Sequence, residues 1–188
     1  MNSFLLLKDI RDTLTDSLSD WVMRTETRQQ NSGGEERYRV PAVYIGQLPP
    51  RRGSQPSNVK NQSEQETDVP FILVRPIDGL LEGEAQADYD IHVAIVCGIY
   101  SHESRERYEK GVEDVMNLCD HLLITLAGQR FWANNLFLHN QPLKWLIGAP
   151  RALGPYEAGL QESGPIFHMV IETSFSRSVF LPAKPLIE

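Results

Sequence analysis

Cysteine is scarce in this sequence: there are two, Cys97 and Cys119, in 188 residues. No C-x-x-C pair occurs, which excludes a thioredoxin-like redox motif. Each cysteine lies among apolar residues, where a free thiol packs as a small hydrophobic side chain. We expect two buried thiols, although the sequence leaves a disulfide between them open.

Long apolar runs are also missing. No stretch reaches the length that a membrane-spanning helix needs. The run at residues 4–7 is too short for the core of a signal peptide, and no basic region precedes it. We therefore expect no membrane partner and a protein that stays in the cytoplasm where it is made. Without a secretion signal, the glycosylation pattern Asn61-Gln62-Ser63 carries no meaning.

Positive charge is under-represented, with 18 basic against 25 acidic side chains and a formal net charge of −7. Such a chain repels phosphate backbones at long range. The only short basic cluster is Arg51-Arg52, which has no interleaved aromatic residues and is typical of a solvated loop tip. We therefore expect no specific binding of nucleic acid.

Motifs that carry chemistry are absent too. No two of the five histidines stand at the i, i+4 spacing of a helical metal site; they are His92, His102, His121, His139 and His168. The nucleophile-elbow pattern G-x-S-x-G does not occur, and the glycines at 33–34 and 154–159 do not match a phosphate-binding loop. In Cys119-Asp120-His121, neighbouring residues of a helix point in different directions and cannot act together. We predict no catalytic, cofactor-binding or metal site.

Four carboxylates gather around an expected hairpin: Glu82, Glu84, Asp88 and Asp90. They could hold a divalent cation or act as acid and base in a dispersed enzyme site. The simpler interpretation is that they solvate an exposed hairpin tip. We favour solvation because the spacing matches no known calcium loop.

The composition is that of a single globular domain over residues 1–188, with 41% hydrophobic and 23% charged residues. Apolar residues at spacings of three and four predict one amphipathic helix over residues 3–24. A second is predicted from a cap at Ser101 or Ser104 to about Ala127, with Gly128 as its C-cap.

Strands are predicted between and after the helices. Residues 38–45 form an edge or interrupted strand, because Pro41 lacks a ladder donor. Residues 69–76 form a second strand, and Asp78-Gly79 marks a turn. Residues 87–100 alternate most clearly and are apolar on both faces, so this strand is central. Within it, Gly98 indicates a bulge or a close backbone approach.

Two further strands are predicted at residues 136–147 and 166–180. The element order favours an α+β fold, a mostly antiparallel β-sheet with two amphipathic helices packed on one face. Polar, Gly- or Pro-rich segments near 25–37, 46–68 and 181–188 are predicted to be flexible arms that order against a partner.

Four segments of the sequence together carry a resemblance to one known family. They read VPFILVRPIDG at 69–79, IHVAIVCGIY at 91–100, GVEDVMNLC at 111–119 and PLKW at 142–145. In this region the chain resembles the tail-terminator, or tail-completion, proteins of long-tailed bacteriophages. In these proteins a "PF-I-VR--DG" strand precedes a "V-I--GTY" strand and then a helix. The chain departs from the family by its insertion at 47–68 and its Pro-rich end.

This resemblance implies a structural subunit of the virion, present in the tail or neck region. Such subunits form a homo-oligomeric ring, commonly a hexamer, that caps the tail tube and joins tail to head. The partners are then tail-tube and neck proteins, and the family has no catalytic residues to transfer. Three alternatives stay open: a head-tail connector subunit, an enzyme with a dispersed acidic site, and a module that binds a partner strand at a sheet edge.

Overall fold

The computed structural model describes residues 3–25, 38–48, 69–83, 86–100, 108–147 and 166–180. The predicted arms fall almost wholly outside these ranges, as do Ser101, Ser104 and the connector before the last strand. In chain order, the elements are α1 (Ser3–Ser17), β1 (Met23–Arg24), β2 (Tyr38–Arg39), β3 (Ala42–Ile45), β4 (Phe71–Glu82), β5 (Gln86–Tyr100), α2 (Tyr108–Gly128), β6 (Phe131–Trp132), β7 (Phe137–Ile147) and β8 (Ile166–Phe180).

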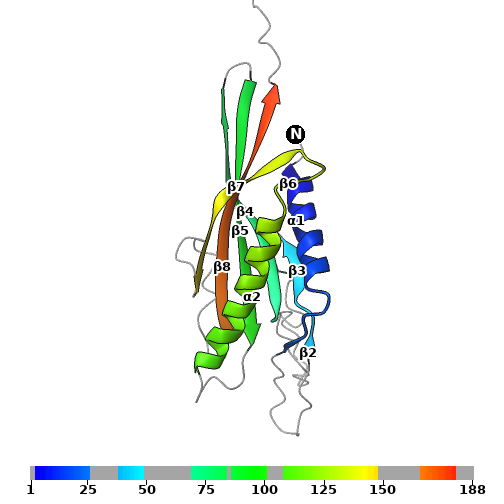
Figure 1. The fold of residues 1–188 in the computed structure, drawn as a ribbon, viewed down its shortest axis with the longest axis vertical. Helices are drawn as coiled ribbons and strands as arrows, with labels where there is room; N and C mark the ends of the chain where they lie inside the picture. Colours follow the sequence, from blue (N-terminus) through cyan, green and yellow to red (C-terminus); the bar gives the residue numbers. More distant parts are fainter. Residues whose placement is uncertain are drawn as a thin grey trace, which may run out of the picture.

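A six-stranded sheet with the order β3-β4-β5-β8-β7-β6 forms the body of the protein (Figure 1). β3 runs parallel to β4, and every other pair in this sheet is antiparallel. The predicted α+β fold is confirmed. β5 is central as predicted, since it pairs along most of its length with β4 on one side and with β8 on the other.

The two faces of β5 differ in what covers them. Its odd-numbered residues from 91 to 99 lie in the main core, together with buried side chains of α1 and α2. Ala94 and Val96, on the other face, belong to a smaller cluster with Val69, Phe71 and Val170. Both helices therefore pack on one face of the sheet, as the amphipathic patterns predicted (Figure 1).

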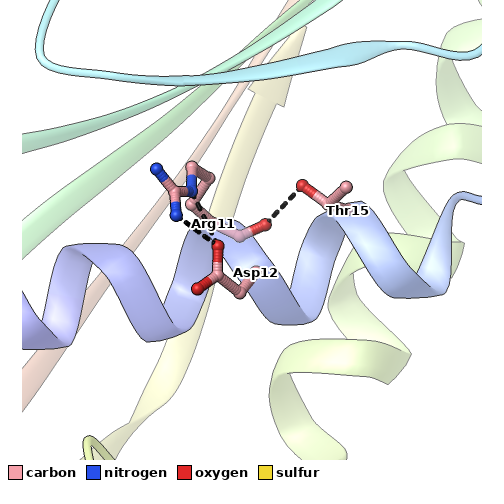
Figure 2. A network of polar contacts seen from close by, with 3 residues as sticks. All are labelled: Arg11, Asp12 and Thr15. Carbon is pink, nitrogen blue, oxygen red and sulfur yellow. Dashed lines mark hydrogen bonds and ion pairs between the residues drawn. The ribbon is translucent and has the colours of Figure 1, made fainter.

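The first helix buries one stripe, and Leu6, Ile10 and Leu14 have no exposed surface. Each such side chain contributes about 2 kcal/mol through burial. The opposite face is polar: Arg11 pairs with Asp12 at 2.6 Å, and Thr15 donates to the Arg11 carbonyl oxygen at 2.8 Å (Figure 2). A pair this exposed adds little stability.

The helix ends at Ser17, earlier than the predicted Arg24. Leu18 stays buried and Trp21 still packs on the core, so the apolar spacing continues after the helix has ended. Serine and aspartate dominate residues 16–20, and their side chains compete for backbone hydrogen bonds. Met23 and Arg24 instead form β1, which pairs with β2.

The first predicted strand is interrupted, as expected for Pro41. Tyr38–Arg39 and Ala42–Ile45 are separate strands, and β3 lies at the sheet edge. The predicted turn at Asp78-Gly79 is wrong: both residues lie within β4, opposite His92 and Ile91, just after a bulge. The ladder continues because β5 offers pairing partners as far as Asp88.

Two glycines allow close packing. Gly98 lies against the ring of Phe71, and a side chain there would collide with that ring, so the close contact is with a side chain and not with another backbone. Gly111 in α2 meets the ring of Phe167 of β8 in the same way. Gly128 is the last residue of α2 rather than a residue beyond it. The short strand β6 was not predicted.

Candidate functional site

The acidic residues predicted around the hairpin do not converge on one point. Glu82 lies opposite Asp88 in the ladder, and Asp90 lies opposite Leu80. Asp88 accepts a hydrogen bond from Ser178 Oγ at 2.8 Å in an exposed position. Glu84 is outside the described residues. Over the part of the chain that the structure describes, no group of three His, Cys, Asp or Glu side chains could hold a metal ion.

Asp78, in the same hairpin, pairs with His92. Its Oδ1 lies 2.7 Å from His92 Nδ1, and the two side chains are 64% and 52% exposed. Charges this open to water interact weakly. The arrangement of these carboxylates favours solvation of the hairpin over acid–base chemistry.

Three histidines have structural roles. His121 Nε2 lies 2.9 Å from the carbonyl oxygen of Ser17. His139 is buried against Phe175 and lies 2.7 Å from Thr173 Oγ1. His168 is buried on the other face of the sheet, near Phe71. His102 lies outside the described residues.

Cys97 and Cys119 are free thiols and both are buried. Burial raises the pKa of Cys119 to about 11, with a further contribution from the charge of Asp120. Burial raises the pKa of Cys97 further still, and the neighbouring Cys119 adds to the effect. Because the thiolate is the reactive form, neither residue is activated as a nucleophile.

The second half of β4, residues 76–82, forms an exposed surface, which we call the β4 edge segment. All seven residues are exposed. They include three large apolar side chains, Ile77, Leu80 and Leu81, at 47%, 52% and 46% exposure. β3 pairs only with residues 71–74, so no described strand covers the outer edge of this segment.

A second open edge lies on β7, at residues 144–147, which we call the β7 edge segment. β6 pairs only with Phe137 and Leu138, and no described strand pairs with the outer side of residues 144–147. Trp145 and Leu146 are 46% and 42% exposed, and Lys144 is exposed beside them. A register shift between Asn140 and Lys144 separates this segment from the start of the strand.

The two edge segments lie at opposite corners of the sheet. Residues that lie opposite one another on successive strands form a row across the sheet. The row of Leu80 contains Asp90 of β5, Ser176 of β8 and Leu138, which is at the start of β7. The β7 edge segment lies at the other end of that strand, level with Ile171 and Val170. In Figure 1 the hairpin of β4 and β5 extends with the end of β8 beyond the helices, away from the end of β7. Open edges with apolar side chains are templates for pairing with another chain.

The chain matches no model of a known protein family. Comparison with curated proteins gives no significant match either. The resemblance of residues 69–145 to tail-terminator proteins therefore stays a prediction. Neither helix in the described residues combines the length and apolar character of a membrane span.

Proposed function

We propose that this chain is a structural virion assembly protein, a tail-terminator or tail-completion subunit. In this proposal, copies form a ring in the tail or neck region of the particle. The ring caps the tail tube and joins it to the head, and it is assembled in the cytoplasm of the host. A hexamer is the ring size that the family resemblance favours.

The observation that carries the proposal is the pair of open sheet edges. The β4 edge segment and the β7 edge segment expose five large apolar side chains between them: Ile77, Leu80, Leu81, Trp145 and Leu146. Isolated apolar residues are normal on a surface, but apolar residues along unpaired strands favour association. A subunit that functions only within an assembly would have such edges.

The placement of the four segments that carry the resemblance gives further support. VPFILVRPIDG contributes to β4, IHVAIVCGIY to β5 and PLKW to β7, while GVEDVMNLC lies in α2. α2 packs on the same face of the sheet as α1. The four segments thus belong to one continuous unit, although a fold by itself does not establish a function.

The charge of the chain agrees with a role around DNA in transit. A net charge of −7 disfavours tight binding of a phosphate backbone. The hairpin adds a locally acidic surface, with Asp78, Glu82, Asp88 and Asp90 on one three-stranded projection. An acidic surface repels the phosphate backbone, which suits a conduit that must let DNA pass without retaining it.

Light scattering after size-exclusion chromatography tests the proposal, alone and with tail-tube protein. We expect a ring-sized species and binding to tube ends, visible by electron microscopy. A chain that stays monomeric and does not bind tail tubes would contradict the proposal. Binding to the head portal in place of the tube would favour the alternative of a head-tail connector subunit.

The enzyme alternative has a separate test. Asp88→Asn and Asp90→Asn remove charges that a dispersed acidic site would need, and both residues lie on the inner strand β5. If the chain is a structural subunit, particles carrying either variant should still join heads to tails. Loss of a hydrolytic activity in these variants, with assembly intact, would favour the enzyme.

A further inference from the structure

We propose that copies of this chain join edge to edge, with the β4 edge segment of one copy pairing with the β7 edge segment of the next. This inference rests on the proposed function, since it names the contact that would build the ring. Each segment presents an unpaired strand edge in the described residues. When a strand is added at such an edge, the backbone N–H and C=O groups of both partners gain hydrogen bonds.

Strand directions fit this contact. β4, β5, β8 and β7 follow one another across the sheet, and each is antiparallel to its neighbour. β4 and β7 therefore run in opposite directions. Rotation about a ring axis keeps the sense in which each strand runs along that axis, so β4 of one copy meets β7 of the next in antiparallel orientation. The helix-covered face then lies on the same side in both copies.

The exposed side chains also match face for face. Leu81 lies opposite Tyr89, on the helix-covered face, and Leu80 lies opposite Asp90, on the other face. Trp145 lies opposite Ile171, whose row runs through Ile95 of the main core. Leu146 lies on the other face, in the row of Val170. Each face of the joint sheet would thus gain one apolar contact.

A single register satisfies every pair. If Leu81 lies opposite Trp145, the antiparallel ladder places Leu80 opposite Leu146 and Glu82 opposite Lys144. Apolar and opposite-charge pairs across strands each contribute about 0.2–1 kcal/mol. Pairing of β4 with β4 in a second copy, centred on Leu80, would instead place Asp78 opposite Glu82 twice, and like charges destabilise a ladder.

The charges within one copy also favour pairing of β4 with β7 of the next copy. Glu82 lies opposite Asp88 on one side, so two carboxylates face each other on one surface of the hairpin. On its other side, no described strand supplies a partner. Lys144 from the next copy would fill that place, and Glu172 lies opposite Lys144 in its own chain. Lys144 would then lie between two carboxylates, Glu82 of the neighbouring copy and Glu172 of its own chain.

The contact also fits a closed ring. Within one copy, the row of Leu81 contains Arg177 of β8, and the row of Trp145 contains Ile171 of the same strand. The two residues that would pair between copies are therefore offset by six residues along the strands. Six residues correspond to a stagger of about 20 Å, and four strands span about 19 Å. These values give a strand tilt of about 45°, close to the range of closed barrels. Contacts between unlike surfaces close into rings when the rotation permits.

Disulfide trapping tests the register in the full chain. Leu80→Cys combined with Leu146→Cys should give covalent oligomers under mild oxidation, read on non-reducing gels and by mass spectrometry. The native thiols do not interfere, because both are buried. The matched control combines Leu81→Cys with Leu146→Cys, which lie on opposite faces, and should stay uncrosslinked. Leu80→Cys alone should also stay uncrosslinked, and its dimerisation would indicate β4–β4 pairing.

A charge exchange gives an independent readout. Glu82→Lys or Lys144→Glu should weaken association at least tenfold in sedimentation, and the double exchange should restore it. If rings form but the cysteine pair does not crosslink, this contact is wrong while the proposed function stands. If the chain neither forms rings nor binds tail tubes, the proposed function fails as well. A persistent monomer without crosslinks overturns the pairing.

Discussion

The carboxylate of Asp9 in α1 accepts a hydrogen bond from the backbone N–H of Ala133, and Oδ2 lies 2.6 Å from the nitrogen. Ala133, Asn134 and Asn135 have φ values of 50°, 58° and 64°, in the left-handed region. That region costs a residue with a side chain about 1 kcal/mol or more. The first helix therefore stabilises a strained turn 124 residues away, between β6 and β7.

Replacement of Asp9 should loosen this turn. We expect Asp9→Ala to lower the free energy of unfolding by about 2 kcal/mol, since it removes a charge-assisted bond from a backbone donor. Asp9→Asn keeps a carbonyl oxygen as acceptor and should lose less. Urea unfolding measures both, and equal losses would show that the hydrogen bond is not the cause.

His121 should stabilise the end of α1 from the neighbouring helix. Its Nε2 donates to the Ser17 carbonyl oxygen at 2.9 Å, and its ring lies 4.6 Å from that of Trp21. His121→Phe keeps the ring contact and removes the donor. We expect a loss of about 1 kcal/mol in the free energy of unfolding. Thermal unfolding monitored by circular dichroism measures the loss, and an unchanged midpoint would contradict this role.

His139 should make stability depend on pH. Burial chiefly lowers its pKa below 6.5, opposed by a hydrogen bond to the backbone of Leu126. The folded state thus favours the neutral ring, which stacks on Phe175 at 5.0 Å. Its contribution is fully present above the unfolded pKa, about 6.5, and is lost as pH falls toward the folded pKa.

His139→Phe retains a stacked ring and cannot titrate, so it is the matched comparison. Between pH 7 and pH 5, the wild-type chain should lose stability relative to this variant. Urea unfolding at several pH values gives the difference directly. Parallel curves for the two proteins over this range would show that His139 titrates alike in the folded and unfolded states.

Much of the fold was predictable because its periodic signals are strong. The alternation in β5 and the stripe of α2 specify both elements within a few residues. The failures have local causes. Asp78-Gly79 has the residues of a turn, yet β5 supplies ladder partners beyond it. Leu18 and Trp21 continue a helical spacing although they pack from a turn.

The open edges could be predicted only in part. Pro41 indicated an edge strand, and β3 lies at the sheet edge. The β4 edge segment was missed, because its exposure depends on where β3 ends, and a sequence does not give that directly. Two bulges also decide which face of the sheet the exposed apolar side chains occupy. One lies between Pro76 and Asp78, before Leu80 and Leu81, and the other between Asn140 and Lys144, before Trp145 and Leu146.

Gly111→Ala should destabilise the protein, against the usual effect of this change in a helix. Alanine in place of glycine normally stabilises a helix by about 1 kcal/mol. At this position, however, the added carbon would meet the ring of buried Phe167. Overpacking of this kind costs about 1–3 kcal/mol. Combining it with Phe167→Leu should recover part of the loss in urea unfolding, because the smaller side chain leaves room. A gain in stability for Gly111→Ala alone would show that the ring moves aside freely and that α2 is not tightly packed on β8 here.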